Sequence, residues 1–203
     1  WVKPDFSSIT AQQYSIVSKE YSFELFLTNT KKPERAPGFS VFDGVTWNTI
    51  LVDSTITNDW HHLTGIVNGE DISLYLDGLL IGTKSMPLQY GINEEGKYES
   101  YPASMAVSEN TITVGASLNS VSTPTKILNS FSGLISDVNI ITDALDNEQI
   151  SNLYLKNKDM FQKELGGIQS IISPELSESE CIELAKEMGL YDEVGGSEIY
   201  TLI

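Results

Sequence analysis

Hydrophobic and polar residues alternate along much of the chain between residues 14 and 141. Successive side chains of an extended strand point to opposite faces of a sheet, so this alternation predicts β-strands with one dry and one wet face. The pattern is clearest in residues 21–27, which read YSFELFL. Further strands are predicted for residues 39–42, 45–51, 60–67, 72–76, 79–83, 111–115 and 131–141.

Turn signals separate these segments at short intervals. Asp43-Gly44 and Asp77-Gly78 each predict a tight hairpin turn with positive φ angles, and Asn68-Gly69 closes another strand. Many short strands with a turn signal every 8–12 residues are typical of an antiparallel sandwich or jelly roll. The predicted fold class is therefore all-β, a two-sheet antiparallel jelly roll.

Helical periodicity is found only near the C-terminus. Residues 146–154 predict a short helix that Asp146 caps, with Glu148 in the first turn. Residues 177–188 predict a second helix, and residues 199–203 have high strand propensity. We therefore expect a sandwich domain over residues 1–158, followed by an acidic, α-containing appendage over residues 159–203.

Composition and charge exclude several classes of partner. The 203 residues contain 12 Lys and Arg against 28 Asp and Glu, which gives a net charge of −16. Nucleic acids bind clustered cations and acidic lipids repel anionic surfaces, so neither is an expected partner. No apolar run is long enough to insert into a membrane. The single cysteine, Cys181, can form neither an internal disulfide nor a thiolate metal site.

Four stretches, in order, carry a family resemblance. They are WVKP at residues 1–4, IVSK at 16–19, WHHL at 60–63 followed by LYLDG at 74–78 and Gly82, and ITVG at 112–115 followed by FSGLISDV at 131–138, Leu145 and Ile150. Over residues 1–155 the chain resembles the laminin-G-like, concanavalin-A-like jelly-roll modules that pentraxins and many secreted bacterial and archaeal proteins share. The resemblance implies a sandwich, outside the cell or at its surface, that binds carbohydrates, proteins or other surface ligands, sometimes through calcium.

The chain departs from this family pattern at two places. The usual first strand, upstream of residues 1–4, is missing from the sequence, so we expect a neighbouring chain or an upstream segment to complete the sheet. The family often carries paired acids in its closing strand, where this chain has Ser136 beside Asp137. Asp137 is therefore the candidate metal ligand, and calcium is the candidate cofactor.

The longest predicted loop, residues 86–109, carries the candidate ligand-binding residues: Tyr90, Tyr98, Glu99 and Tyr101. Aromatic rings stack on sugars while acids and amides bond hydroxyls, and tyrosine is also enriched in protein interfaces. A loop folded over the sandwich, with its tyrosines on apolar edges, is the alternative. A basic turn at Lys31, Lys32 and Arg35 could instead hold an anionic ligand or simply be solvated.

No pattern of catalytic residues is visible. Adjacent strand residues point to opposite faces, so His61 and His62 cannot hold one metal ion, and we assign them, with Trp60 in the core, to the framework. Glycoside hydrolysis needs two carboxylates facing one sugar, and no predicted strand carries such a pair. The sequence thus predicts a non-catalytic binding or adhesion module. A structural subunit of a filament, surface layer or capsid is the alternative, and a glycan-active enzyme ranks last.

Overall fold

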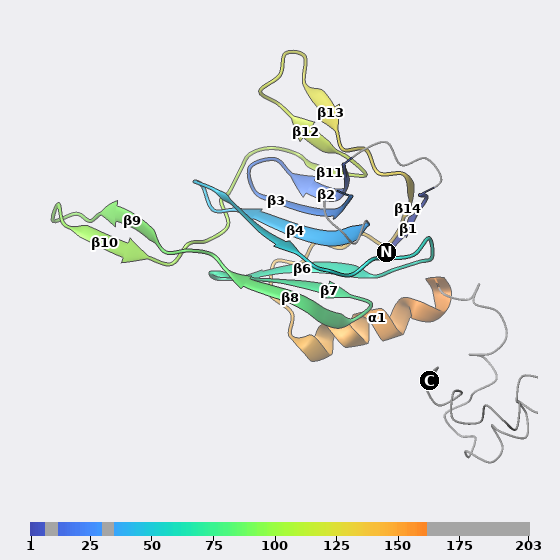
Figure 1. Cartoon of the computed structure of the whole chain (residues 1–203). Coiled ribbons are helices and arrows are strands. Elements are labelled where there is room, and N and C mark those ends of the chain that lie inside the picture. The colour runs from blue at the N-terminus through green and yellow to red at the C-terminus, as the bar shows by residue number, and fades with distance from the viewer. Residues whose placement is uncertain (7–11, 30–34, 162–203) are drawn as a thin grey trace, which may run out of the picture. The chain divides into compact units, whose positions relative to one another are not determined.

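A computed structural model describes residues 1–6, 12–29 and 35–161 (Figure 1). The chain divides into two compact units, Trp1–Gln162 and Lys163–Ile203. The helix predicted for residues 177–188, the strand predicted for residues 199–203 and Cys181 lie outside the described residues, as do Lys31 and Lys32.

One layer of the first unit is a five-stranded antiparallel sheet. Its strand order is β11-β2-β3-β4-β5. The strands are β2 (Gln13–Lys19), β3 (Phe23–Thr28), β4 (Ala36–Phe42), β5 (Trp47–Leu51) and β11 (Ile112–Val114). All of its strand pairs are antiparallel, as the sequence predicts.

The second layer combines two smaller sheets. One has the order β6-β7-β8, and the other pairs β1 with β14. A bridge between Val2 and His61 links them through two backbone hydrogen bonds, at 2.9 and 2.8 Å. The strands are β1 (Val2–Pro4), β6 (Leu63–Asn68), β7 (Asp71–Leu76), β8 (Leu79–Ser85) and β14 (Gly133–Ile135).

The inward side chains of the two layers form the core. Val41 on β4 and Ile72 and Leu74 on β7 are completely buried. Burial of one such side chain stabilises the fold by roughly 1.5–3 kcal/mol. The predicted all-β antiparallel sandwich is confirmed. Strands β2 and β4 are buried at successive positions, so these two strands lack the wet face that the alternation predicts.

The two Asp-Gly turns differ in length. Asp77 and Gly78 have φ angles of 50° and 80° and join β7 to β8 as the tight turn that the sequence predicts. After β4 the prediction is wrong, because β5 begins at Trp47 rather than at residue 45. The Asp43 carboxylate accepts hydrogen bonds from the backbone N–H groups of Val45 and Thr46, at 2.9 and 2.8 Å, and holds both out of the ladder.

The helix is longer than its periodicity predicts. Helix α1 spans Asn147–Phe161. Asp146 caps it as predicted, because its carboxylate accepts from the Gln149 N–H while the Gln149 side chain accepts from the Asp146 N–H, at 2.8 and 2.9 Å. Phe161, in the added turns, stacks on Trp1 with ring centroids 4.6 Å apart. No helix among the described residues is long and apolar enough to cross a membrane.

Candidate binding site

The long segment predicted as a loop contains a β-hairpin that stands out from the sandwich (Figure 1). It consists of β9 (Gln89–Ile92) and β10 (Tyr98–Tyr101), and we call residues 89–101 the arm. Its four predicted ligand-binding residues all lie on these two strands. A second hairpin, formed by β12 (Ser117–Asn119) and β13 (Lys126–Leu128), also leaves the body of the unit (Figure 1).

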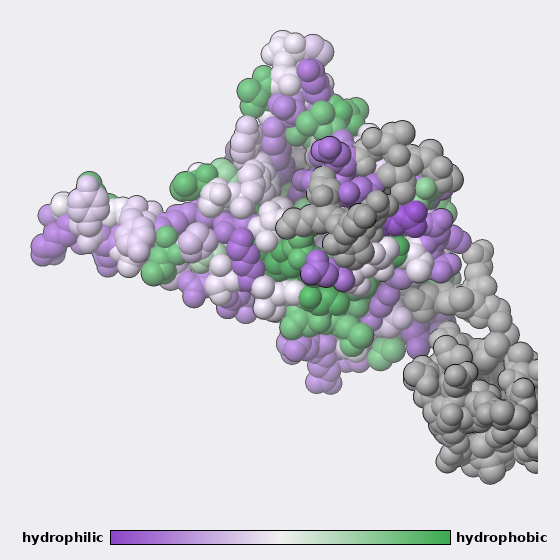
Figure 2. Space-filling view, in the orientation of Figure 1, coloured by the Kyte–Doolittle hydropathy of each residue, from purple (hydrophilic) through white to green (hydrophobic). Residues whose placement is uncertain are grey.

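The base of the arm is anchored in the sandwich. Met86 and Ala103, which flank the arm, are buried in the core between the sheets. The Gln89 side-chain amide donates a 2.6 Å hydrogen bond to the backbone carbonyl of Asp43. The arm is thus attached to the core on both sides, and its far end extends into solvent (Figure 2).

One face of the arm is apolar and uncovered. Ile92 pairs with Tyr98 and Tyr90 with Ser100, so Tyr90, Ile92 and Tyr98 lie on the same face. Their exposed fractions are 75%, 64% and 85%. We call these three residues the apolar face of the arm. Diagonal neighbours on a strand pair stand about 7–8 Å apart, so a single ligand can contact both tyrosine rings.

Tyr101 and Glu99 lie on the opposite face. They pair with Gln89 and Gly91. A Cβ atom on Gly91 would lie 3.1 Å from the Tyr101 ring, which therefore covers this glycine. The structure thus places the four predicted residues on one hairpin but divides them between its two faces. The sequence reasoning missed Ile92, which its spacing of two from Tyr90 could have revealed.

The tip of the arm is a polar turn. The Asn93 side-chain oxygen accepts hydrogen bonds from the backbone N–H groups of Glu95 and Lys97, at 3.1 and 3.0 Å. The Lys97 ammonium contacts the Glu95 carboxylate at 2.9 Å. Both side chains are well exposed, so the pair contributes only about 0–1 kcal/mol and exchanges partners readily.

The candidate metal ligand Asp137 is exposed just after β14, with a φ angle of 51°. Its carboxylate accepts hydrogen bonds from the side-chain amides of Asn139 and Asn157, at 3.3 and 3.1 Å. Within the described ranges, no group of three or more His, Cys, Asp or Glu side chains is placed to hold a metal ion. The oxygen ligands at hand are thus one carboxylate and, if both amides rotate, two amide oxygens.

The two adjacent histidines point into different surroundings. His61 Nδ1 lies 2.8 Å from an Asp77 carboxylate oxygen, and its Nε2 accepts the Thr57 backbone N–H at 3.2 Å. Nδ1 therefore carries the ring proton, and Nε2 is already engaged by a backbone donor. His61 thus connects the loop before β6 to the β7–β8 turn through its two ring nitrogens, which is what a framework role requires.

His62 packs against the Trp1 ring, at 5.1 Å between centroids. Burial lowers its pKa to about 4. Trp60 differs from the prediction, because it is only half-buried and contacts Phe161 at 5.0 Å between centroids. Phe161 is the last residue of helix α1, so the end of this helix covers part of the indole.

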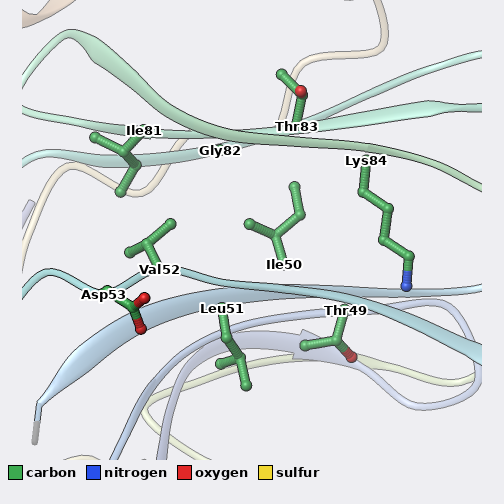
Figure 3. A pocket seen from close by; sticks show the side chains of 9 residues that line it. All are labelled: Thr49, Ile50, Leu51, Val52, Asp53, Ile81, Gly82, Thr83 and Lys84. Carbon is green, nitrogen blue, oxygen red and sulfur yellow. The ribbon is translucent and has the colours of Figure 1, made fainter. Parts of the chain in front are cut away.

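A cleft of about 410 Å³ opens between β5 and β8 (Figure 3). Ile50, Val52 and Ile81 supply apolar surface, and Asp53 is the one acid that lines it. Glycoside hydrolysis requires two facing carboxylates, so this cleft lacks the groups for that reaction. The lining residues are Thr49, Ile50, Leu51, Val52, Asp53, Ile81, Gly82, Thr83 and Lys84.

Solved structures that match this chain include a carbohydrate-binding module and an S-layer domain-containing protein. The CBM40 of the Ruminococcus gnavus IT-sialidase is 16% identical, with a TM-score of 0.47, over 73% of this chain and 77% of that one. The structure of the same module bound to alpha2,6 sialyllactose is 15% identical, with a TM-score of 0.46, over 73% of this chain and 77% of that one. An S-layer domain-containing protein of Clostridium thermocellum is 18% identical, with a TM-score of 0.34, over 76% of this chain and 69% of that one.

No curated protein sequence matches the chain at a significant level. A family model, described as the concanavalin A-like lectin/glucanases superfamily, matches residues 1–151. That range contains both layers of the sandwich, the arm, Asp137 and the start of helix α1. The chain therefore belongs to the concanavalin A-like lectin/glucanases superfamily.

Proposed function

We propose that this chain is a non-catalytic binding module that recognises a carbohydrate or protein ligand through the arm, at the cell surface or outside the cell. The observation that carries the proposal is the apolar face of the arm. Tyr90, Ile92 and Tyr98 are more than half exposed, on a two-stranded ribbon that no described element covers on that face. Burial of this face against a ligand would remove a large apolar area from water.

The chemistry of the arm suits recognition. A tyrosine offers an apolar ring with a hydroxyl at its end, and burial of one aromatic side chain covers about 150–250 Å². At roughly 25 cal/mol per Å², two rings supply several kcal/mol before the costs of association. Tyr90 and Tyr98 share a face, so both can contribute to one contact.

The arrangement of acids supports a non-catalytic role. Glu24, the carboxylate on the five-stranded sheet whose pKa burial raises, lies on β3 and faces Ser18 and Ser40 across the ladder. Neither cross-strand neighbour is a second acid, and the β5–β8 cleft holds one acid only. Binding without bond cleavage is what such an arrangement supports.

We propose further that Asp137 is a calcium ligand. Calcium in proteins takes six to eight oxygen ligands, several of them carboxylates. Asp137, Asn139 and Asn157 would supply one carboxylate and two amide oxygens, at most four side-chain oxygens, so we expect millimolar affinity. Isothermal titration of CaCl₂ into the chain and into Asp137→Asn measures it, and equal heats from both would contradict the assignment.

The experiment for ligand recognition compares the two faces of the arm. A glycan array and a panel of surface proteins are probed with the chain, with and without calcium, and the best ligand is titrated. Tyr98→Ala and Tyr90→Ala are expected to weaken that ligand at least about tenfold. Tyr101→Ala, on the opposite face of the same hairpin, is the matched control. Full affinity in all three variants would contradict recognition by the arm.

A structural subunit of an assembly is the second candidate function. The observation that favours it is the pair of strands β5 and β8. Each ends its sheet, and within the described residues neither has a partner on its outer side. Edge strands present unpaired backbone groups, and such edges pair with strands of other chains unless they are protected. The cleft between two such edges offers hydrogen-bonding groups, and the side chains of Ile50, Val52 and Ile81 offer apolar contact.

A further inference from the structure

We propose that the cleft between β5 and β8 accepts strand β10 from the arm of a second copy of this chain, which pairs antiparallel with β5. The inference rests on the proposed function in one respect, because it takes the arm as the recognition element. It adds the identity of the partner and the surface that receives the arm.

The cleft has an apolar floor. The side chains of Ile50 and Val52 point from the β5 side toward β8 (Figure 3). A Cβ atom on Gly82 would lie 2.7 Å from Ile50 Cγ2, so the two layers are closely packed at this point. A strand added beside β5 would therefore find a formed apolar wall rather than an open core.

A bulge makes β5 the better acceptor of the two edges. Leu74 pairs with Gly82 and Tyr75 with Leu80, which leaves Ile81 without a partner in the ladder of β7 and β8. Bulges disturb the regular spacing of an edge and redirect side chains. In Figure 3 the Ile81 side chain points into the space between β8 and β5. The ladder of β4 and β5 has no such shift, so β5 presents a regular edge.

The donor strand matches this edge in length and in free hydrogen-bonding groups. Strand β10 has four residues and spans about 13 Å, while β5 has five residues, Trp47–Leu51, and spans about 16 Å. Within the described residues β10 pairs only with β9, so its outer edge is free. Because the arm stands away from its own sandwich, a second copy can approach it from outside (Figure 1).

One register satisfies both the charges and the apolar faces. Figure 3 shows Asp53 and Ile81 at one end of the cleft and Thr49 and Lys84 at the other. A β10 strand antiparallel to β5 begins at the Asp53 end, which brings Lys97 opposite Asp53. Glu99 then lies opposite Leu51, the last residue of β5, and Tyr98 lies opposite Val52, which follows it. A shift by one residue would exchange the faces of the whole strand.

This register turns the apolar face of the arm inward. Val52 points toward β8 and Leu51 points away from it (Figure 3). Opposed residues in a ladder share a face, so Tyr98 joins Val52 and Ile81 in the cleft, while Glu99 points outward with Leu51. Tyr90 and Ile92, on the same face as Tyr98, would extend the covered surface. The contact thus accounts for the apolar face and for the open edge together.

Charge reversal tests the proposal with little risk to folding, because Asp53 and Lys97 are both exposed. Analytical ultracentrifugation of the full chain at about 0.15 M salt, where repulsion between acidic copies is screened, should show concentration-dependent association. Lys97→Glu and Asp53→Lys should each weaken self-association by about tenfold, and an equimolar mixture of the two variants should restore it. Lys126→Glu, an exposed lysine on the other hairpin, should have no effect. A monomeric wild type at high concentration, or no rescue in the mixture, overturns the proposal.

Disulfide trapping tests the register. In a Cys181→Ser background, copies with Glu99→Cys are mixed with copies with Leu51→Cys under mild oxidation. Opposed residues of an antiparallel pair have the Cα separation that a disulfide requires, so this mixture should form a covalent dimer. The mixture of Tyr98→Cys with Leu51→Cys, which is one residue out of register, should form much less. Equal yields from the two mixtures overturn the register.

Ligand binding separates this inference from the proposed function. Asp53→Lys changes the acceptor cleft and leaves the arm intact, so a glycan or protein ligand of the arm should bind this variant as it binds the wild type. A monomeric wild type whose ligand affinity depends on Tyr98 would overturn the inference alone. The opposite result is a wild type that self-associates but binds no glycan or protein ligand through Tyr98. That result would overturn the proposed ligand recognition and support the inference.

Discussion

The Phe39 ring on β4 lies directly on the backbone of Gly65 on β6. A Cβ atom on Gly65 would stand 2.6 Å from two carbons of that ring, well inside van der Waals contact. Phe39 is buried in the core between the sheets, so the ring has little room to move aside. The two layers therefore approach closely at this point, as they do at Gly82 and Ile50.

Gly65→Ala should therefore destabilise the sandwich. Overpacking of a filled core typically costs about 1–3 kcal/mol, and denaturant unfolding measures it. The double variant Gly65→Ala with Phe39→Leu should recover part of the loss, because the smaller side chain makes room for the methyl group. A double variant whose loss equals the sum of the two single losses would contradict a direct contact.

The fold could be predicted from the sequence where one local rule decides. Alternation across residues 21–27 predicted β3, the Asp77-Gly78 pair predicted the β7–β8 turn, and Asp146 predicted the start of α1. In these places a local rule selects the backbone conformation, so no distant contact is needed to choose the element. Burial along β3 does not follow the predicted alternation, because the adjacent Phe26 and Leu27 are both buried.

Distant contacts decided the rest. The stacking of Phe161 on Trp1 lies at the end of helix α1 beyond its periodic stretch, and the side chain of Asp43 displaced the start of β5. The division of the arm residues between two faces depends on the register of β9 with β10, which pairs Tyr98 with Ile92. Composition showed that tyrosines are concentrated in this segment. Only the strand register shows which of them share a face and can contact one ligand.

The capping box of helix α1 gives a prediction with a matched control. Asp146→Ala removes the acceptor of the Gln149 N–H and should cost about 0.5–2 kcal/mol of stability. Asp143→Ala removes the same charge three residues earlier, outside the helix, and should be nearly neutral. Thermal unfolding of both variants at one pH checks the difference, and equal shifts in Tm would show that charge rather than capping matters.

The contribution of Glu24 to the free energy of unfolding should be larger in mild acid than near neutral pH. Burial raises its pKa, and its Oε1 atom has no hydrogen-bond partner. Above the ordinary pKa of the carboxyl, the unfolded chain has lost the proton that the folded state still holds, so this contribution to stability falls as pH rises through the raised pKa. Glu24→Gln should be more stable than the wild type at pH 7 and equally stable at pH 4. A stability difference that does not change with pH in urea titrations would contradict this account.

The contribution of His62 to the free energy of unfolding should be smaller in mild acid than near neutral pH, opposite to that of Glu24. Its folded-state pKa of about 4 lies below the ordinary value of 6.5, chiefly because of burial. Between these two values the unfolded chain binds a proton that the folded chain does not, so stability falls as pH drops from 6.5 to 4. After allowance for partial solvent screening, the loss should be about 1–2 kcal/mol.

His62→Phe isolates this contribution, because the ring can keep its contact with Trp1 while the titrating group is removed. The free energy of unfolding of this variant should depend less on pH between 6.5 and 4 than that of the wild type. The double variant with Glu24→Gln should remove both contributions and the two effects should add, since Glu24 lies on β3 and His62 precedes β6 in the other layer. An unchanged pH profile in His62→Phe would place the acid sensitivity of the sandwich elsewhere.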